Sequence, residues 1–207
     1  MTLRLDVPAI LRNSLVLSGF LLTGAVATGS LPNDAIPFRL PDTEKIEAIS
    51  SIIARGEGDW SSVNRGYAGD TPGGMEQLFG KSCEEFSVQE VLNLQSSGRI
   101  YAVGRYQFIP STLRYAVQVS EIDLEAAFGE ETQDQLLVAL LKHKRPAVWA
   151  YLTGVGSLNH ALDALALEWA SIAISGGRSY YQGVGGNGAH VTREEAAAAL
   201  EAARMLF

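Results

Sequence analysis

Hydrophobic residues recur at helical spacing through most of the chain after residue 43 and predict a largely α-helical body. The first such pattern places four isoleucines on one face of a helix: Ile46, Ile49, Ile52 and Ile53. We expect Thr43 to cap the start of this helix and Gly56 to end it, because short polar residues favour N-caps and glycine favours the C-terminal end.

Capping residues predict where the later helices begin. The predicted starts are Ser87 with Glu90, Pro110, Thr132 with Gln135, Ser157, and Thr192 with Glu195. Residues 59–80 instead hold many glycines without periodicity, and residues 99–108 form a short β-prone stretch. The sequence therefore predicts the α+β class, mostly helical, with a small irregular β region between the first helices.

An uncharged, apolar stretch precedes this body. No charged residue occurs between Arg12 and Asp34, and Ala25-Val26-Ala27 has the small-residue pattern of a cleavage site. The stretch is about long enough to cross a bilayer, but serine, glycine and threonine dilute its hydrophobicity. We therefore predict that residues 1–29 are a signal peptide or a weak membrane anchor, with a buried core helix as the alternative.

The rest of the chain divides into a linker and one domain. Residues 30–42 contain three prolines and read as the linker, and residues 43–207 read as the domain. This organisation predicts export to the periplasm or cell envelope, with membrane association, if any, through the N-terminal segment.

Composition and charge exclude several classes of partner. The chain has 207 residues, of which 47% are hydrophobic and 19% charged, as expected of a globular domain. Its formal net charge of -7 argues against nucleic acid as a partner. Cys83 is the single cysteine, so no internal disulfide can form. The histidines are scattered without metal-ligand spacing, and we expect neither a metal nor a cofactor.

Glu57 is the first candidate for chemistry. It follows the predicted first helix and lies between Gly56 and Gly58, which keep bulky side chains away. A carboxylic acid in this place is attached to a core-facing element but points out of it, and partial burial would raise its pKa. The alternative is a solvated glutamate in a helix-terminal loop.

Two further stretches complete a recognisable pattern. Gly104-Arg105-Tyr106-Gln107 comes second, and Trp169-Ala170-Ser171 comes third, followed by glycine, tyrosine and glutamine. With Glu57 ahead of them, this order resembles the phage lambda-type endolysins, lysozyme-like muramidases that act as lytic transglycosylases. The resemblance runs from Ile46 to the C-terminus. It departs from the family in lacking a proline after Ile172 and in its long glycine-rich stretch, residues 183–188.

The resemblance implies a lysozyme-like fold, a substrate and a set of site residues. The substrate would be the glycan strands of peptidoglycan, cut at the β-1,4 bond between N-acetylmuramic acid and N-acetylglucosamine. Glu57 would be the catalytic acid. The substrate-binding residues would be Arg105, Tyr106, Gln107, Tyr181 and Gln182, with Tyr180 as the alternative to Tyr181. Simpler interpretations stay open for two of them, since Arg105 can be structural and Gln107 can bond only the loop backbone.

The chemistry depends on whether a second carboxylate exists. Two-carboxylate hydrolysis needs one beside the acid. Asp59 is two residues from Glu57, too near to sit across a sugar ring, and Asp70 lies in a glycine-rich loop. The position nine residues on, where phage lysozymes commonly have aspartate, is Gly66. These residues favour a single Glu57 that acts as acid and then as base and leaves a 1,6-anhydro end.

Two other functions stay open at this point. One is a hydrolytic lysozyme. The other is a non-catalytic protein that keeps a lysozyme-like fold, either tethered to a membrane or carried in a virion. The acidic net charge favours this second alternative, because positive charge would help an enzyme approach the anionic wall.

Overall fold

Helices make up most of the described chain, and a short two-stranded sheet joins them. The computed structural model describes residues 40–66 and 74–207, which belong to one compact unit, Arg39–Phe207. The predicted N-terminal segment, residues 1–29, and most of the predicted linker lie outside the described residues. None of the helices in the described ranges is long and apolar enough to cross a membrane.

The two strands are interspersed among the helices along the chain. The helices are α1 (Asp42–Lys45), α2 (Glu47–Glu57), α3 (Gly74–Phe79), α4 (Val88–Ser96), α5 (Pro110–Ser120), α6 (Glu130–Ala139), α7 (Pro146–Leu152), α8 (Leu158–Ala166) and α9 (Arg193–Arg204). A 3₁₀ turn, Cys83–Glu85, precedes α4, and a π-helical turn, Leu140–Lys144, continues α6.

The small β region lies where the sequence predicts it. Strand β1 (Val63–Asn64) pairs with β2 (Ala102–Val103) in an antiparallel register that puts Val63 opposite Val103. The chain then turns back on itself, and Phe108 forms a bridge with Val103. The prediction of a mostly helical α+β chain with a small irregular β region is therefore confirmed.

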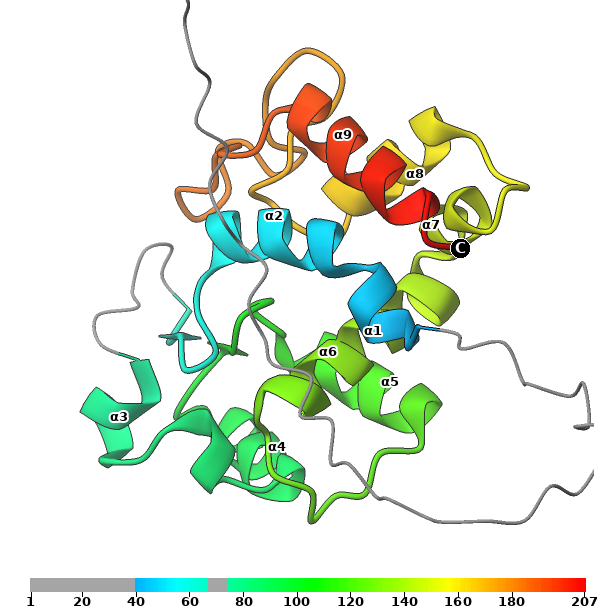
Figure 1. The fold of residues 1–207 in the computed structure, drawn as a ribbon. Helices are drawn as coiled ribbons and strands as arrows, with labels where there is room; N and C mark the ends of the chain where they lie inside the picture. Colours follow the sequence, from blue (N-terminus) through cyan, green and yellow to red (C-terminus); the bar gives the residue numbers. More distant parts are fainter. Residues whose placement is uncertain (1–39, 67–73) are drawn as a thin grey trace, which may run out of the picture. The chain divides into compact units, whose positions relative to one another are not determined.

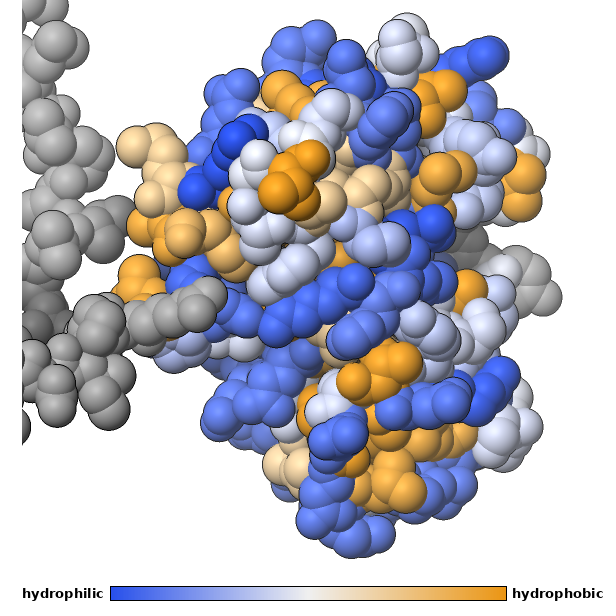
Figure 2. Space-filling model, turned by 90° about the vertical axis from the view of Figure 1, so that its right-hand side faces the viewer, coloured by the Kyte–Doolittle hydropathy of each residue, from blue (hydrophilic) through white to orange (hydrophobic). Residues whose placement is uncertain are grey.

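The helices form two groups (Figure 1). In one group α2 packs along α9, and α7 and α8 pack against each other and against α9. In the other, α4 and α6 contact α5. The π-helical turn connects α6 to α7 and so joins the two groups. The surface seen in Figure 2 is mostly hydrophilic, with hydrophobic residues in separate patches.

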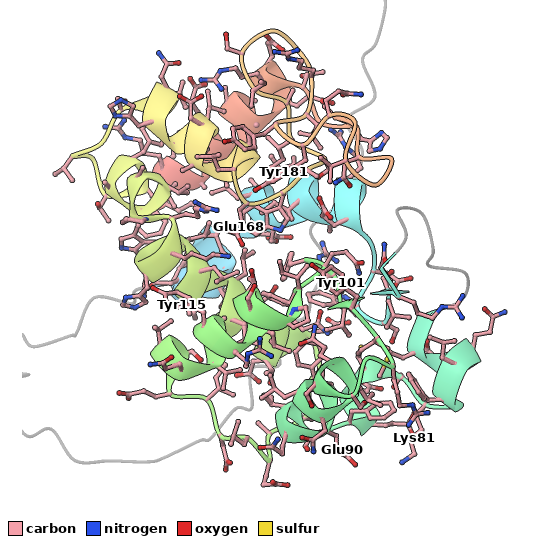
Figure 3. All side chains as sticks on the ribbon, turned by 180° about the vertical axis from the view of Figure 1, so that it is seen from behind. Lys81, Glu90, Tyr101, Tyr115, Glu168 and Tyr181 are labelled. Atoms are coloured by element: carbon pink, nitrogen blue, oxygen red, sulfur yellow. The ribbon has the colours of Figure 1, made fainter. Side chains whose placement is uncertain are left out.

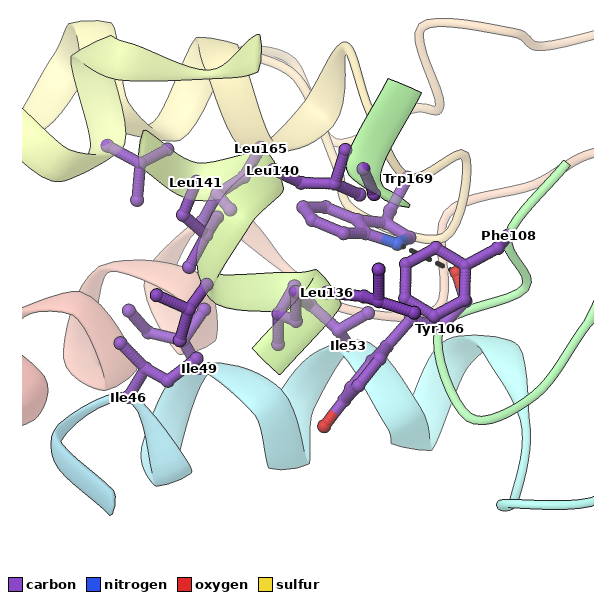
Figure 4. Close-up of a cluster of buried hydrophobic side chains, with 14 of the residues drawn as sticks. Ile46, Ile49, Ile53, Tyr106, Phe108, Leu136, Leu140, Leu141, Leu165 and Trp169 are labelled. Carbon is purple, nitrogen blue, oxygen red and sulfur yellow. Dashed lines mark hydrogen bonds between the residues drawn. The ribbon is translucent and has the colours of Figure 1, made fainter. Parts of the chain in front are cut away.

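The core forms where α2 meets the π-helical turn and the end of α8 (Figure 4). Ile46, Ile49 and Ile53 are fully buried there, while Ile52 is only partly buried against the core. Their neighbours are Leu136, Leu140, Leu141, Leu165 and Trp169. Each such aliphatic side chain contributes about 1.5–3 kcal/mol when fully buried. This packing anchors the helix that ends at Glu57.

Most predicted helix starts are confirmed, and two are wrong. The capping boxes of Ser87 with Glu90 and of Thr192 with Glu195 form, Ser157 caps α8, and Pro110 opens α5. The helix predicted from Thr132 instead begins at Glu130 with Gly129 as its N-cap, and the Thr132 hydroxyl, inside the helix, donates to the Ala127 carbonyl at 2.7 Å. Thr43 lies inside α1, which begins after Pro41, so it does not cap the first helix.

Candidate active site

Glu57 is the last residue of α2, and a serine from far along the chain holds its carboxylate. The Ser171 hydroxyl donates to Glu57 Oε1 at 2.5 Å, and the Ser171 amide lies 3.4 Å from the same oxygen. Ser171 itself is buried. The approach is close enough to require Gly56, since a Cβ there would lie 2.4 Å from Ser171 Cβ. The glycine beside Glu57 therefore makes room for its hydrogen-bond donor.

Burial controls the acidity of Glu57. The carboxyl is partly buried, and loss of contact with water raises its pKa above the ordinary value of 4.5. The hydrogen bonds from Ser171 and the charge of His190 lower the pKa, but they do not cancel the effect of burial. Glu57 therefore keeps a proton at a higher pH than a solvated glutamate, as a general acid must.

A cavity of about 500 Å³ opens at Glu57. Its lining comes from the end of α2, the strand region, the segment after α8 and the glycine-rich loop: Glu57, Asn64, Gly66, Tyr101, Ala102, Gln107, Ile109, Glu168, Trp169, Ala170, Tyr181, Val184, Gly185 and Asn187. Tyr101, Glu168 and Tyr181 are labelled in Figure 3 and lie toward the centre of that view. The cavity is within the 300–1,000 Å³ range of small-molecule sites.

Gln107 reaches this cavity from a strained turn. Its φ of 45° lies in the left-handed region, which residues other than glycine seldom adopt. The side-chain amide donates to the Gly104 carbonyl at 2.9 Å and weakly to the Ser62 carbonyl at 3.4 Å. Gln107 therefore bonds the loop backbone and lines the cavity at the same time.

A buried glutamine that the sequence analysis missed supports the same turn. Gln133 of α6 is fully buried, and its Oε1 accepts from the Arg105 amide at 2.8 Å. Its Nε2 donates to the Trp60 carbonyl at 2.9 Å and the Phe128 carbonyl at 3.1 Å. Gly104 is needed there, since a Cβ would meet Gln133 Oε1 at 2.3 Å. One side chain thus joins three loops beneath the site.

Tyr181 lies at the cavity, whereas its neighbours do not. The Tyr181 hydroxyl donates to the Leu167 carbonyl at 2.8 Å, and its ring lines the cavity. Tyr180 is 56% exposed, and Gln182 is exposed as well; neither lines the cavity. Of the two alternatives for the cleft tyrosine, the structure brings Tyr181 to Glu57.

Tyr106 and Arg105 face away from Glu57. Tyr106 is only 1% exposed and its hydroxyl donates to Asp134, so its side chain belongs to the core, and the residue does not line the cavity at Glu57. The Arg105 guanidinium lies over the Trp60 ring, 4.4 Å from its centroid, and lines a separate hollow with Asp134. The structural interpretation of Arg105 therefore agrees with its position.

Of the positions considered for a second carboxylate, neither of the two that the structure describes brings a carboxylate to the cavity. Asp59 accepts hydrogen bonds from the Ser61 amide and the Ser62 hydroxyl, at 3.0 Å and 2.8 Å, and does not line the cavity. Gly66 lines it but carries no side chain. Asp70 lies outside the described residues.

Glu168 is a carboxylate at the cavity that the sequence analysis missed. Its side chain is 5% exposed, with Oε1 2.6 Å from Lys144 Nζ and Oε2 2.6 Å from Arg145 Nε. Thr112 also bonds Oε1, at 3.4 Å. Because both oxygens are paired with cations, Glu168 is poorly suited to attack a sugar. Its place directly before Trp169 in the third motif is the signal that could have identified it.

Comparisons with known proteins add no assignment. No protein-family model matches the chain, and neither curated proteins nor solved structures gave a match. Within residues 40–66 and 74–207, no group of histidine, cysteine and acidic residues could hold a metal ion.

Proposed function

We propose that this protein is a peptidoglycan-cleaving lytic transglycosylase with a lysozyme-like fold. The observation that carries the proposal is the position of Glu57, a carboxyl of raised pKa that Ser171 orients at a cavity also lined by Gln107 and Tyr181. These are the residues that the resemblance to lambda-type endolysins assigns to the acid and the cleft. The cavity is concave, and its lining carries carboxyl, amide and hydroxyl groups among apolar ones, which is the composition of small-molecule sites.

The reaction uses Glu57 twice. As acid, Glu57 donates its proton to the glycosidic oxygen, and the bond from that oxygen to C1 of N-acetylmuramic acid breaks. As base, the carboxylate then accepts the proton of the 6-hydroxyl of the same sugar, while O6 forms a bond to C1. The products are a 4-hydroxyl end and a 1,6-anhydro end. Glu57 is protonated again, and no water is consumed.

The surroundings of Glu57 support the use of one carboxylate. Asp59 is bonded to its own loop, Gly66 has no side chain, and Glu168 is paired with cations. An intramolecular nucleophile compensates for a missing second group, because the 6-hydroxyl is already held near C1. If Glu168 or Asp70 served as a base for water, the protein would instead be a hydrolytic lysozyme.

The location we propose is the periplasm or cell envelope. The support is the segment before the domain, residues 1–29, which is uncharged after Arg12 and carries a small-residue cleavage pattern. Whether this segment is cleaved or retained as a weak anchor, the domain reaches the compartment that holds its substrate.

The net charge of -7 favours one other function, a non-catalytic envelope or virion protein. The deciding experiment incubates purified full-length protein with peptidoglycan and analyses the soluble fragments by mass spectrometry. Fragments with 1,6-anhydro ends, lighter than hydrolysed ends by one water, are the expected result. Reducing ends indicate a lysozyme, and intact peptidoglycan indicates the non-catalytic protein.

A further inference from the structure

A second, smaller cavity adjoins the one at Glu57. This neighbour has a volume of about 100 Å³ and shares Gln107, Ile109, Glu168, Trp169 and Tyr181 with the larger cavity. One water takes about 30 Å³ in the liquid, so the smaller cavity has room for a compact polar group. A substrate sugar in the main cavity could extend a substituent into it.

Positive charge is in excess at this end. Lys144 and Arg145 line the smaller cavity, and both pair with the single negative charge of Glu168. One cation would suffice to neutralise Glu168, so the cluster carries a net charge of about +1. The excess lies in a cleft of a chain whose formal net charge is -7.

Both cations keep donors and exposed surface after pairing with Glu168. The Lys144 side chain is 29% exposed, and its ammonium also donates to the Thr112 hydroxyl at 2.7 Å. The Arg145 side chain is 23% exposed, and its Nη2 donates to the Leu167 carbonyl at 2.9 Å. An ammonium has three N–H donors and a guanidinium five, so both retain capacity for an acceptor.

The backbone that carries these cations is unusual. Lys144 ends the π-helical turn Leu140–Lys144, and Arg145 follows it before α7 begins at Pro146. Single π turns are rare and often occur at functional sites. At the end of this turn the consecutive residues Lys144 and Arg145 both pair with the carboxylate of Glu168.

We propose that Lys144 and Arg145 bind a carboxylate of the peptide stem that peptidoglycan carries on its muramic acid residues. This inference rests on the proposed function and adds a specificity to it. A guanidinium and an ammonium side by side match a carboxylate, through charge and through directed donors. The enzyme would then prefer peptide-bearing glycan to bare glycan, and the preference would weaken as salt increases.

The test measures binding without turnover. The full chain carrying Glu57→Gln is titrated calorimetrically with a tetrasaccharide of alternating N-acetylglucosamine and N-acetylmuramic acid that bears peptide stems. A second titration uses the same compound with its stem carboxylates converted to amides. We expect about tenfold tighter binding of the carboxylate form, because hydrogen bonds to charged groups exceed neutral ones.

Variants assign the preference to the cluster. Each substitution is introduced into the chain that already carries Glu57→Gln. Lys144→Gln should remove most of the tenfold preference, while Lys144→Arg, which keeps the charge, should retain it. Lys142→Gln is the matched control, since Lys142 is 33% exposed, pairs with Asp42 and lines neither cavity of the cleft. Thermal melting of each variant shows whether the fold persists.

The outcomes separate this inference from the proposed function. Equal affinity for the two tetrasaccharides overturns the inference and leaves the proposed function standing. A preference that survives both Lys144→Gln and Arg145→Gln in folded protein also overturns it. Failure to bind either tetrasaccharide contradicts the proposed function and the inference together.

Discussion

Ser171 donates its hydroxyl hydrogen to Glu57 across 114 residues of sequence, at 2.5 Å. The bond stabilises the charged form of the carboxyl, while burial stabilises the neutral form. Glu57 is thus held between two opposing influences and can exchange a proton in both directions. A residue that must act first as acid and then as base needs this balance.

Replacement of Glu57 by glutamine should abolish cleavage of peptidoglycan. The amide keeps the shape of the side chain but cannot donate the proton, so we expect a loss of at least about 10²–10⁴-fold in rate. The rate at which soluble muropeptides are released from peptidoglycan measures this loss. Glu201→Gln, on the exposed side of α9, is the control. Undiminished activity in Glu57→Gln would show that another group is the acid.

Removal of the Ser171 hydroxyl should shift the pH profile. Ser171→Ala removes a hydrogen bond that lowers the pKa of Glu57, so this pKa should rise further. The limb of kcat/KM that falls as Glu57 loses its proton should move to higher pH, and the maximum should fall because the carboxyl is less well oriented. Ser175→Ala, at an exposed position, should leave the profile in place. If the limb of the pH profile stays in place in Ser171→Ala, then Ser171 does not influence the pKa of Glu57.

Alanine at position 56 should destabilise the protein although it favours helices elsewhere. In an exposed helix Gly→Ala gains up to about 1 kcal/mol. Here the new Cβ would lie 2.4 Å from Ser171 Cβ, and such overpacking costs about 1–3 kcal/mol. Gly188→Ala is the matched control, because nothing lies within 4 Å of its Cβ position. Thermal unfolding compares the stability of the two variants. A higher Tm in Gly56→Ala would contradict the close approach of position 56 to Ser171.

Glu57 should cost stability at neutral pH. Since its pKa is raised in the folded state, the native protein binds more protons than the unfolded chain above pH 4.5, and stability falls as pH rises through that window. Glu57→Gln removes this cost. We expect it to melt a few degrees above wild type at pH 7, since about 1 kcal/mol shifts Tm by ~2–4 °C in a domain of this size. The difference should vanish below pH 4, and a lower Tm at pH 7 would contradict the burial.

Loss of the Glu168 charge should destabilise the cleft. Glu168→Gln leaves Lys144 and Arg145 without their counter-charge. Breaking a fully buried ion pair costs about 3–5 kcal/mol. The two cations are partly exposed, so we expect about 2 kcal/mol in urea unfolding at pH 7. Glu201→Gln serves again as the control. An unchanged free energy of unfolding in Glu168→Gln would show that the Glu168 charge does not stabilise the protein.

The parts of the fold that sequence analysis predicted correctly are those that depend on near neighbours. Ser87 and Glu90 cap each other within a single turn, so their spacing is sufficient to place α4. Thr132 and Gln135 have the same spacing, but the Thr132 hydroxyl bonds Ala127 outside the helix. A spacing cannot show whether a hydroxyl will accept from the backbone as a helix cap or donate to a carbonyl outside the helix.

The site could be predicted only in part, for a similar reason. Glu57 could be identified because its helix and its flanking glycines are consecutive in sequence. Gln133 and Glu168 were missed because their roles depend on partners 73 and 24 residues away. Tyr106 and Gln107 are adjacent, yet one is buried in the core and the other lines the cavity. In an irregular loop, sequence alone does not show which way each side chain turns.

A buried hydrogen bond beneath the cavity joins two segments that line it. The Trp169 indole donates to the Tyr106 carbonyl at 3.1 Å, and the bond is buried (Figure 4). It ties the turn that carries Gln107 to the segment that follows α8, both of which line the cavity. Opening the cleft as a hinge would break this bond away from water. A ligand of the cavity would therefore meet a largely preformed opening, in which an exposed side chain such as Tyr101 can rotate while the two segments stay joined.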